Sequence, residues 1–97
     1  MTVIYEKIAI IGVGLIGASI ALAVRRANLA THIVGCDADE SAVDTVRDLA
    51  LVDEAVTDPV VAVADADLVI MAVPVGAMGG LAASIVPAMK PGAVLTD

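Results

Sequence analysis

Short apolar runs and longer amphipathic stretches follow each other along this chain. The apolar runs predict strands, and stretches in which apolar residues recur every three or four positions predict helices. We expect strands at residues 4–11, 32–36, 55–57, 68–73 and 93–96. We expect helices at residues 15–27, 40–50 and 77–86, and a short helix that opens at Asp58-Pro59. The pattern therefore predicts a regular alternation of strand and helix.

The helical periodicity also predicts which side chains face the core. In the first predicted helix, one face is expected to carry Ile16, Ile20, Ala23, Val24 and Ala27. In the second, the inward positions are expected to be Val43, Val46 and either Leu49 or Ala50. Asp39 is the expected N-cap of that second helix, and Pro59 suits the first turn of the short helix.

Alternating strands and helices imply right-handed crossovers and a parallel sheet. We therefore expect an α/β fold: a Rossmann-type doubly wound parallel sheet with strand order 3-2-1-4-5, cut off after the fifth strand. Residues 1–97 are expected to form one domain. In this strand order the first and fourth strands diverge at their carboxyl ends, and ligands bind in the crevice between them.

Composition narrows the class of partner. The chain is 60% hydrophobic but has no Phe, no Trp and one Tyr, so aliphatic residues must build the core. A net charge of −7 without a basic stripe argues against nucleic acid. The single cysteine, Cys36, rules out an internal disulfide or a multi-cysteine metal site, and we expect it to be a small buried residue. This cysteine usage fits a reducing cytoplasm, which is the expected location.

The uncharged stretch from Ile8 to Val24 raises the question of a membrane segment. It has 17 residues, fewer than the roughly 20 that a spanning helix needs. Three glycines interrupt it, and the preceding Glu6-Lys7 is not a basic leader. We therefore expect no membrane partner.

Within that stretch, three glycines lie between the first predicted strand and the first predicted helix. A turn of this kind, G-x-G-x-x-G, binds the pyrophosphate of a dinucleotide. Gly12 allows a tight turn, Gly14 lets the pyrophosphate approach the backbone, and Gly17 lets the helix pack on the strand. The alternative is a glycine-rich turn in an apolar protein, without a ligand.

The residues between these glycines are expected to act through their backbone. The free N–H groups of the first helical turn point at the phosphates, and the helix dipole favours an anion there. Val13, Leu15 and Ile16 would bind in this way, and we expect the side chains of Leu15 and Ile16 to be buried.

Asp37 follows the second predicted strand, 20 residues beyond Gly17. An acid at this position accepts hydrogen bonds from the adenosine ribose hydroxyls and repels a 2′-phosphate. Ala38 and Asp39 come next, where an NADP site would have Arg or Lys. The sequence therefore favours NAD over NADP. Asp37 could instead cap the next helix, and the two roles could coexist.

Other polar residues suggest no catalytic centre. No Ser–His–Asp arrangement, carboxylate pair or metal-ligand cluster is visible in the sequence, so no catalytic or metal-binding residue is assigned. His32 is expected on the surface, at the strand end away from the crevice. Asp65 and Asp67 are expected in a turn. The methionines expected to fill the core are Met71, Met78 and Met89.

Several segments together resemble the amino-terminal domain of prephenate and arogenate dehydrogenases. The more specific of them are Leu15-Ile16 inside the glycine turn and the Ala-Val-Pro-Val segment at residues 72–75. The resembling segments, in chain order, are residues 10–19, 33–37, 66–69, 72–75, 90–93 and 96–97. Hydroxyacid and 6-phosphogluconate dehydrogenases share the general pattern and remain an alternative, as does a non-catalytic NAD-binding module.

The resemblance implies an oxidoreductase that oxidatively decarboxylates prephenate or arogenate with NAD, in tyrosine biosynthesis, a branch of aromatic amino acid biosynthesis. In such an enzyme a hydride passes from the ring to the nicotinamide as carbon dioxide leaves. In family terms, the glycines hold the pyrophosphate and Asp37 the ribose. The residues implied to line the nicotinamide side are Val73, Pro74 and Val75, and Asp97 is implied to lie near the substrate.

The chain departs from the family pattern at two positions. Ala18 stands where many relatives have a glycine, and Cys36 where an aromatic is common. The family's Gly-Ser segment, catalytic histidine and helical dimerisation domain, which makes the whole enzyme a homodimer, would come after Asp97. We therefore expect residues 1–97 to bind NAD without turnover.

Overall fold

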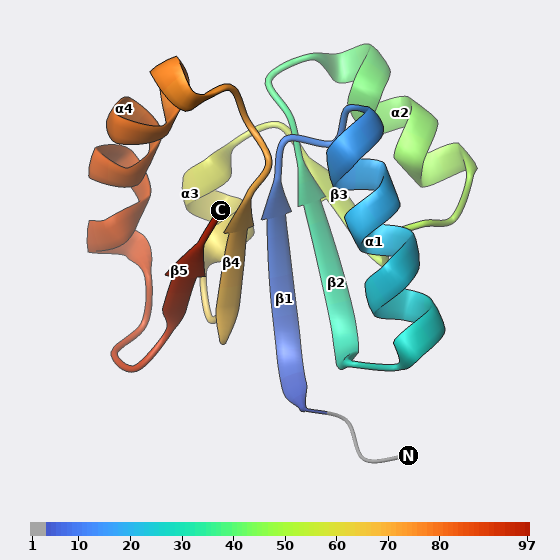
Figure 1. Cartoon of the computed structure of the whole chain (residues 1–97), viewed down its shortest axis with the longest axis horizontal. Coiled ribbons are helices and arrows are strands. Elements are labelled where there is room, and N and C mark those ends of the chain that lie inside the picture. Colours follow the sequence, from blue (N-terminus) through green and yellow to red (C-terminus); the bar gives the residue numbers. More distant parts are fainter. Residues whose placement is uncertain (1–3) are drawn as a thin grey trace.

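The structure is a computed structural model that describes residues 4–97. Strands and helices alternate as predicted (Figure 1). The strands are β1 (Tyr5–Ile11), β2 (Ala30–Cys36), β3 (Glu54–Val56), β4 (Leu68–Met71) and β5 (Val94–Thr96). The helices are α1 (Leu15–Ala27), α2 (Glu40–Asp48), α3 (Pro59–Val63) and α4 (Val75–Ile85), and a short 3-10 helix, η1 (Val86–Ala88), follows α4.

The five strands form one parallel sheet in the order β3-β2-β1-β4-β5. The predicted fold class and strand order are therefore confirmed. In the register of the sheet, Ile8 of β1 lies opposite Ile33 of β2 and Leu68 of β4. The strands point the same way, and α1, α2 and α4 begin at the edge where the strands end (Figure 1).

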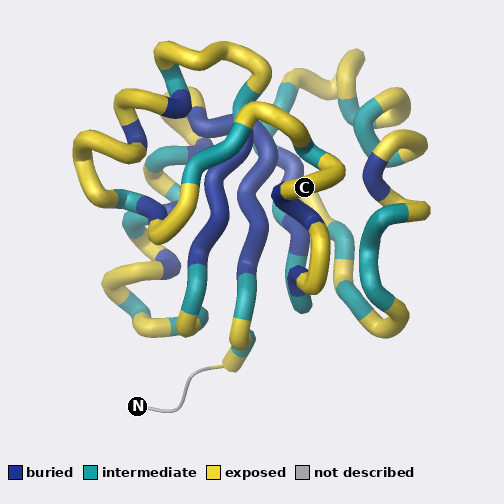
Figure 2. The backbone as a smooth tube through the Cα atoms, turned by 180° about the vertical axis from the view of Figure 1, so that it is seen from behind, coloured by how far each residue is buried: buried dark blue, intermediate teal, exposed yellow. Residues whose placement is uncertain are grey.

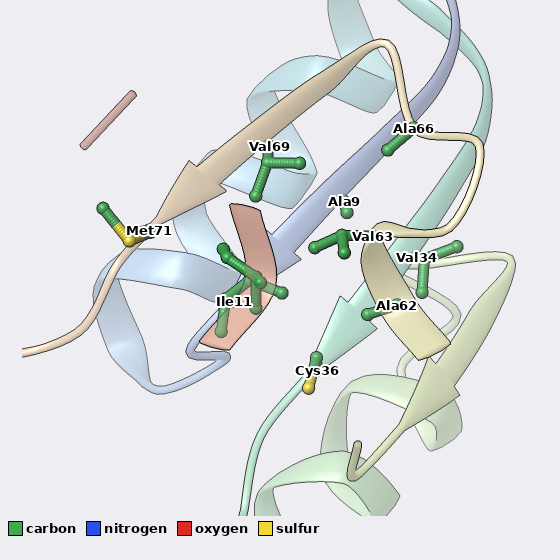
Figure 3. Close-up of a cluster of buried hydrophobic side chains, with 10 residues drawn as sticks. Ala9, Ile11, Val34, Cys36, Ala62, Val63, Ala66, Val69 and Met71 are labelled. Atoms are coloured by element: carbon green, nitrogen blue, oxygen red, sulfur yellow. The ribbon is translucent and has the colours of Figure 1, made fainter. Parts of the chain in front are cut away.

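Successive residues of β1 point to opposite faces of the sheet, as the pleat requires. Ile8 and Ile10 belong to one buried cluster, which α1 and α2 cover with residues such as Val24. Ala9 and Ile11 belong to the other, together with Ala62 and Val63 of α3 (Figure 3) and Ile85 of α4. Burial is concentrated in the middle strands (Figure 2), because helices cover both of their faces. The sheet is thus doubly wound, with two cores.

Four predicted boundaries were off by two residues. β2 begins at Ala30 rather than residue 32, because Ala30 pairs with the first residue of β1. β4 ends at Met71 rather than 73, and α4 begins at Val75 rather than 77, directly after Pro74 as its N-cap. α2 ends at Asp48 rather than 50, because the chain turns at Ala50, which has a left-handed φ of 55°. The predicted starts of β1, β3 and β5 and the predicted ends of β3 and α4 differ by one residue, and the other predicted boundaries agree.

The predicted core face of α1 was wrong in part. Val24 is buried, but Ile16 is 70% exposed, and Gly17 and Ala21 occupy the buried face instead. Gly17, Ala21 and Val24 follow the helical spacing i, i+4, i+7. The rotation of α1 is therefore set by the contact of Gly17 with Gly12, directly after β1, rather than by the largest apolar side chains of the helix.

For α2 and α3 the predicted starts agree with the structure, but one predicted core position of α2 does not. In α2, Val43 and Val46 are buried, but neither Leu49 nor Ala50 is, because both lie beyond the end of the helix. Asp39 and Asp58 cap α2 and α3: their carboxylates accept 2.9 Å hydrogen bonds from the Ser41 and Val60 N–H groups. The predicted cap at Asp39 and the first-turn position of Pro59 are confirmed.

Three acidic side chains join the amino ends of the strands. Asp67, expected in a turn, also accepts 3.0 Å hydrogen bonds from the Glu6 and Lys7 N–H groups of β1. Asp53 accepts one of 2.7 Å from Ile33 N–H of β2. His32 lies 3.3 Å from Glu54 at this same edge, opposite the crevice. Within residues 4–97, no helix has the length and apolar character to cross a membrane.

Candidate functional site

The glycine turn is built from two backbone contacts that exclude side chains. Gly12 has a φ of +96°, and a Cβ added there would lie 2.5 Å from the Ala72 carbonyl oxygen after β4. A Cβ added to Gly17 would overlap the Gly12 carbonyl oxygen. The roles predicted for these two glycines, a tight turn and close helix packing, agree with this geometry.

Gly14 differs from both, because nothing lies within 4 Å of the position that its Cβ would occupy. It is the N-cap of α1, with no side-chain hydrogen bond to the helix and no acidic residue in the first turn. In the described part of the chain α2 and α3 have aspartate caps, whereas α4, which starts at the same edge as α1, has none. The first-turn amides of α1 are therefore left open to an anion.

Asp37 joins the end of β2 to the glycine turn. Its Oδ2 accepts a 3.0 Å hydrogen bond from Val13 N–H, and its Oδ1 accepts a 2.9 Å hydrogen bond from Asp39 N–H. A carboxylate has about four lone-pair sites, so each oxygen can accept a further bond from a ribose hydroxyl. The alternative that Asp37 caps α2 is not what the structure shows, because Asp39 is the N-cap.

Two pockets lie on either side of the glycine turn, and Val73 lines both. The first has a volume of about 220 Å³, and Asp37 lies in its wall. Its other lining residues are Ile11, Gly12, Cys36, Ala38, Thr57, Pro59, Ala77 and Leu81. The second has a volume of about 590 Å³ and includes Asp97. Its other lining residues are Gly14, Leu15, Ile16, Ile20, Met71, Ala72, Pro74 and Met78.

The pockets bring together most of the residues that the sequence singled out. Val73, Pro74 and Asp97 share the second pocket with the start of α1. Val75 lines neither pocket and is 83% exposed. The expected burial of Leu15 and Ile16 is wrong: they are 87% and 70% exposed, at the mouth of the second pocket.

Sequence reasoning missed the far wall of the first pocket. Thr57 and Pro59 follow β3, and Ala77 and Leu81 lie on α4. Thr57 could have been found, because it follows a parallel strand and must lie at the edge where all the strands end. Leu81 gave no such signal, since its position depends on how α4 packs against α3.

The remaining reactive side chains do not form a catalytic group. Cys36 is buried as predicted, and burial, with the nearby charges of Asp37 and Asp58, raises the pKa of its thiol to about 11. His32, the one histidine of the chain, lies at the amino end of β2 with Glu54. Residues 4–97 contain no group of three or more His, Cys, Asp or Glu side chains placed to bind a metal.

Sequence comparison places the chain among known proteins. The family described as prephenate dehydrogenase, nucleotide-binding domain, matches residues 20–97. The chain is 40% identical over 94 residues to a cyclohexadienyl dehydrogenase of Zymomonas mobilis, covering 97% of this chain and 32% of that protein. It is 34% identical over 93 residues to a prephenate dehydrogenase of Lactococcus lactis, covering 95% and 26%. The chain thus spans about a third or less of these relatives.

Solved structures agree with this assignment. A prephenate dehydrogenase from A. aeolicus, in complex with hydroxyphenyl propionate and NAD+, matches with a TM-score of 0.87 and 26% identity, over 95% of this chain and 32% of that one. An arogenate dehydrogenase from Synechocystis matches with a TM-score of 0.87 and 29% identity, over the same shares. The glycine turn, the sheet order and the family match lead to one conclusion: this chain belongs to the family of prephenate dehydrogenase nucleotide-binding domains.

Proposed function

We propose that residues 1–97 bind NAD and form the cofactor-binding part of a dehydrogenase that acts on prephenate or arogenate. The observation that carries this proposal is the uncapped start of α1, which lies between two pockets. One pocket has Asp37 in its wall and the other has Asp97. An extended dinucleotide needs this order of features: a ribose acceptor, an anion site and a second pocket.

Each part of NAD has a matching group on the chain. The pyrophosphate would lie against Gly14 and the open amides of α1, where the helix dipole favours negative charge. The adenosine would enter the smaller pocket and donate its ribose hydroxyls to Asp37. The nicotinamide would face Val73 and Pro74 in the larger pocket. A 2′-phosphate would meet the Asp37 carboxylate, so NAD is preferred to NADP.

Bound NAD would supply the hydride acceptor for oxidation of the substrate ring as its carboxylate leaves as carbon dioxide. The residues of this chain bind and orient the cofactor. The one histidine is too far from the crevice to act as a base, since it lies at the opposite edge of the sheet. We therefore propose that the proton-transfer group, most substrate contacts and the contacts of a homodimer come from other parts of a longer, cytoplasmic enzyme.

Calorimetric titration with NAD and NADP tests the cofactor assignment. We expect the chain to bind NAD more tightly than NADP. Asp37→Asn should weaken NAD binding about ten- to a hundredfold, because hydrogen bonds to a charged group contribute roughly 1.5–3 kcal/mol, and should reduce the preference over NADP. Asp48→Asn is the matched control, since it removes the same charge from an exposed position on α2. Tighter binding of NADP than of NAD by the unaltered chain would refute the assignment.

A second assay addresses the reaction. NADH formation with prephenate or arogenate is measured for residues 1–97 and for the complete product of the gene. We expect residues 1–97 to bind NAD without turnover. Turnover by residues 1–97 alone would contradict the proposal that the proton-transfer group comes from other parts of the enzyme. A complete gene product that binds NAD but oxidises neither substrate would favour a non-catalytic module or a different dehydrogenase.

A further inference from the structure

Val13, between the first two glycines of the turn, is fixed at two points. Its N–H donates to Asp37 Oδ2 at 3.0 Å. Its side chain is buried beside Gly35 and Val52: a Cβ added to Gly35 would lie 3.1 Å from Val13 Cγ1. The hydrogen bond joins the turn to Asp37, directly after β2, and the side chain packs against Gly35 of β2 and Val52 before β3.

The residues on either side of Val13 are not fixed in this way by side chains. Gly12 has a φ of +96°, which glycine adopts without strain, and Gly14 has open space around it. A turn with glycine on both sides of one residue has many accessible conformations. Backbone contacts also hold the turn: Gly12 N–H donates to the Cys36 carbonyl at 2.7 Å, and Gly17 packs against Gly12. The two contacts of Val13 add to these and restrict the turn to the conformation that aims the α1 amides at the crevice.

The Asp37 carboxylate is itself oriented before any ligand binds. Its second oxygen, Oδ1, accepts from Asp39 N–H at 2.9 Å, and Asp39 is fixed as the N-cap of α2. The carboxylate thus links the start of α2 to the glycine turn that leads into α1. Because Asp39 N–H holds one oxygen of the carboxylate and Val13 N–H binds the other, Asp37 can set the position of the turn.

We propose that Asp37 is a positioning residue for the pyrophosphate turn, in addition to being an acceptor for the ribose. Through Val13 N–H it holds the turn in its binding conformation, so that less conformational entropy is lost when the pyrophosphate binds. The ribose and pyrophosphate subsites are thereby coupled through one carboxylate. This inference rests on the proposed function, because it concerns the same cofactor.

A pair of ligands separates the two roles of Asp37. Affinities for NAD, and for an NAD analogue that lacks both hydroxyls of the adenosine ribose, are measured for the unaltered chain and for Asp37→Ala. If Asp37 only accepted hydrogen bonds from the ribose hydroxyls, its loss would not weaken the affinity for the analogue, which lacks those hydroxyls. If Asp37 also positions the turn, Asp37→Ala should weaken the analogue as well, by about two- to tenfold, the usual effect of one hydrogen bond. Binding of the analogue by Asp37→Ala that is as tight as by Asp37→Asn, which removes the same charge but keeps an acceptor for Val13 N–H, would overturn the inference.

The loss of the negative charge of Asp37 acts in the opposite direction, because it favours an anionic ligand. Weaker binding of the analogue by Asp37→Ala would therefore be evidence for positioning and could not arise from charge. Val13→Ala offers a second variant, since it removes the buried anchor and leaves Asp37 in place. It should weaken NAD and the analogue by the same factor, whereas weakening of neither would count against the role of Val13.

One measurement needs no variant and so does not depend on mutant folding. Amide hydrogen exchange of the ligand-free chain should show a protected Val13 N–H beside a rapidly exchanging Gly14 N–H. Rapid exchange at Val13 would overturn the inference. Failure of the unaltered chain to bind NAD would refute the proposed function instead, so the two failures can be told apart.

Discussion

Gly17 lies directly against the carbonyl oxygen of Gly12, and no side chain fits between them. A Cβ on Gly17 would overlap that oxygen and would also approach the Ala72 side chain to 3.6 Å. This contact brings the start of α1 onto the end of β1. It also fixes the rotation of the helix, so that Ala21 and Val24 are buried.

Gly17→Ala should therefore destabilise the fold and weaken NAD binding together. The Gly12 carbonyl belongs to the backbone and cannot move aside as the end of a flexible side chain can. Forcing an extra carbon into a packed site typically costs about 1–3 kcal/mol. Displacement of α1 would also move the amides of its first turn away from the pyrophosphate. Urea unfolding and NAD titration of the variant test both effects. A variant as stable as the unaltered chain would show that the contact is not as close as described.

Gly79→Ala is the matched substitution in a helix without such a contact, and its expected effect has the opposite sign. Gly79 is exposed on α4, and nothing lies within 4 Å of its Cβ position. Alanine is favoured over glycine inside a helix by about 0.5–1 kcal/mol. We expect the midpoint of urea unfolding to rise and NAD affinity to stay the same. A fall in stability would mean that the exposed face of α4 makes contacts that require a glycine.

The strand order and the helix caps could be predicted because they depend on local signals. Apolar runs such as residues 68–71 mark strands that helices cover on both faces, one face buried and the other partly buried, and alternation with helices leaves few topologies to consider. Asp39 and Asp58 cap helices through bonds to residues two positions away. Strand ends were less predictable, since β2 begins where its partner β1 does rather than where its own apolar run begins.

The site shows the same division between local and distant information. The glycine turn and Asp37 were recognised because they follow two adjacent parallel strands, so their spacing in sequence brings them together at one edge of the sheet. The burial of Leu15 and Ile16 was predicted wrongly, because hydrophobicity alone cannot show that Gly17 lies on the buried face of α1. Leu81 was missed, since it joins the first pocket only through the packing of α4.

Asp67 should make stability depend on pH at both ends of the range. Its bond to the Lys90 ammonium, followed by that from Lys7 N–H, lowers its pKa from the ordinary 3.8. The stabilisation is therefore complete above that ordinary value and is lost as the pH falls through the lowered one. The same pair raises the pKa of Lys90 above 10.5, so the stabilisation is also lost in strong alkali.

Asp67→Asn tests this account, because it removes the charge and leaves the shape. We expect lower stability at neutral pH, and weaker dependence of the unfolding free energy on pH below about 4 and above about 10. Asp48→Asn on the exposed side of α2 is the control and should leave both dependences as they were. If Asp67→Asn and the unaltered chain had the same pH profile, the link between β1, β4 and Lys90 would contribute nothing to stability.

Cys36 should react with thiol reagents only when the fold opens. It is 1% exposed, and burial, with the charges of Asp37 and Asp58, raises its pKa to about 11. At pH 8 the thiolate that attacks such reagents is therefore scarce as well as inaccessible. Iodoacetamide labelling should be slow in buffer and should accelerate with urea in parallel with the unfolding transition. The fully unfolded chain at high urea serves as the fast reference, and labelling of the folded chain at that reference rate would contradict the burial of Cys36 beneath the first pocket.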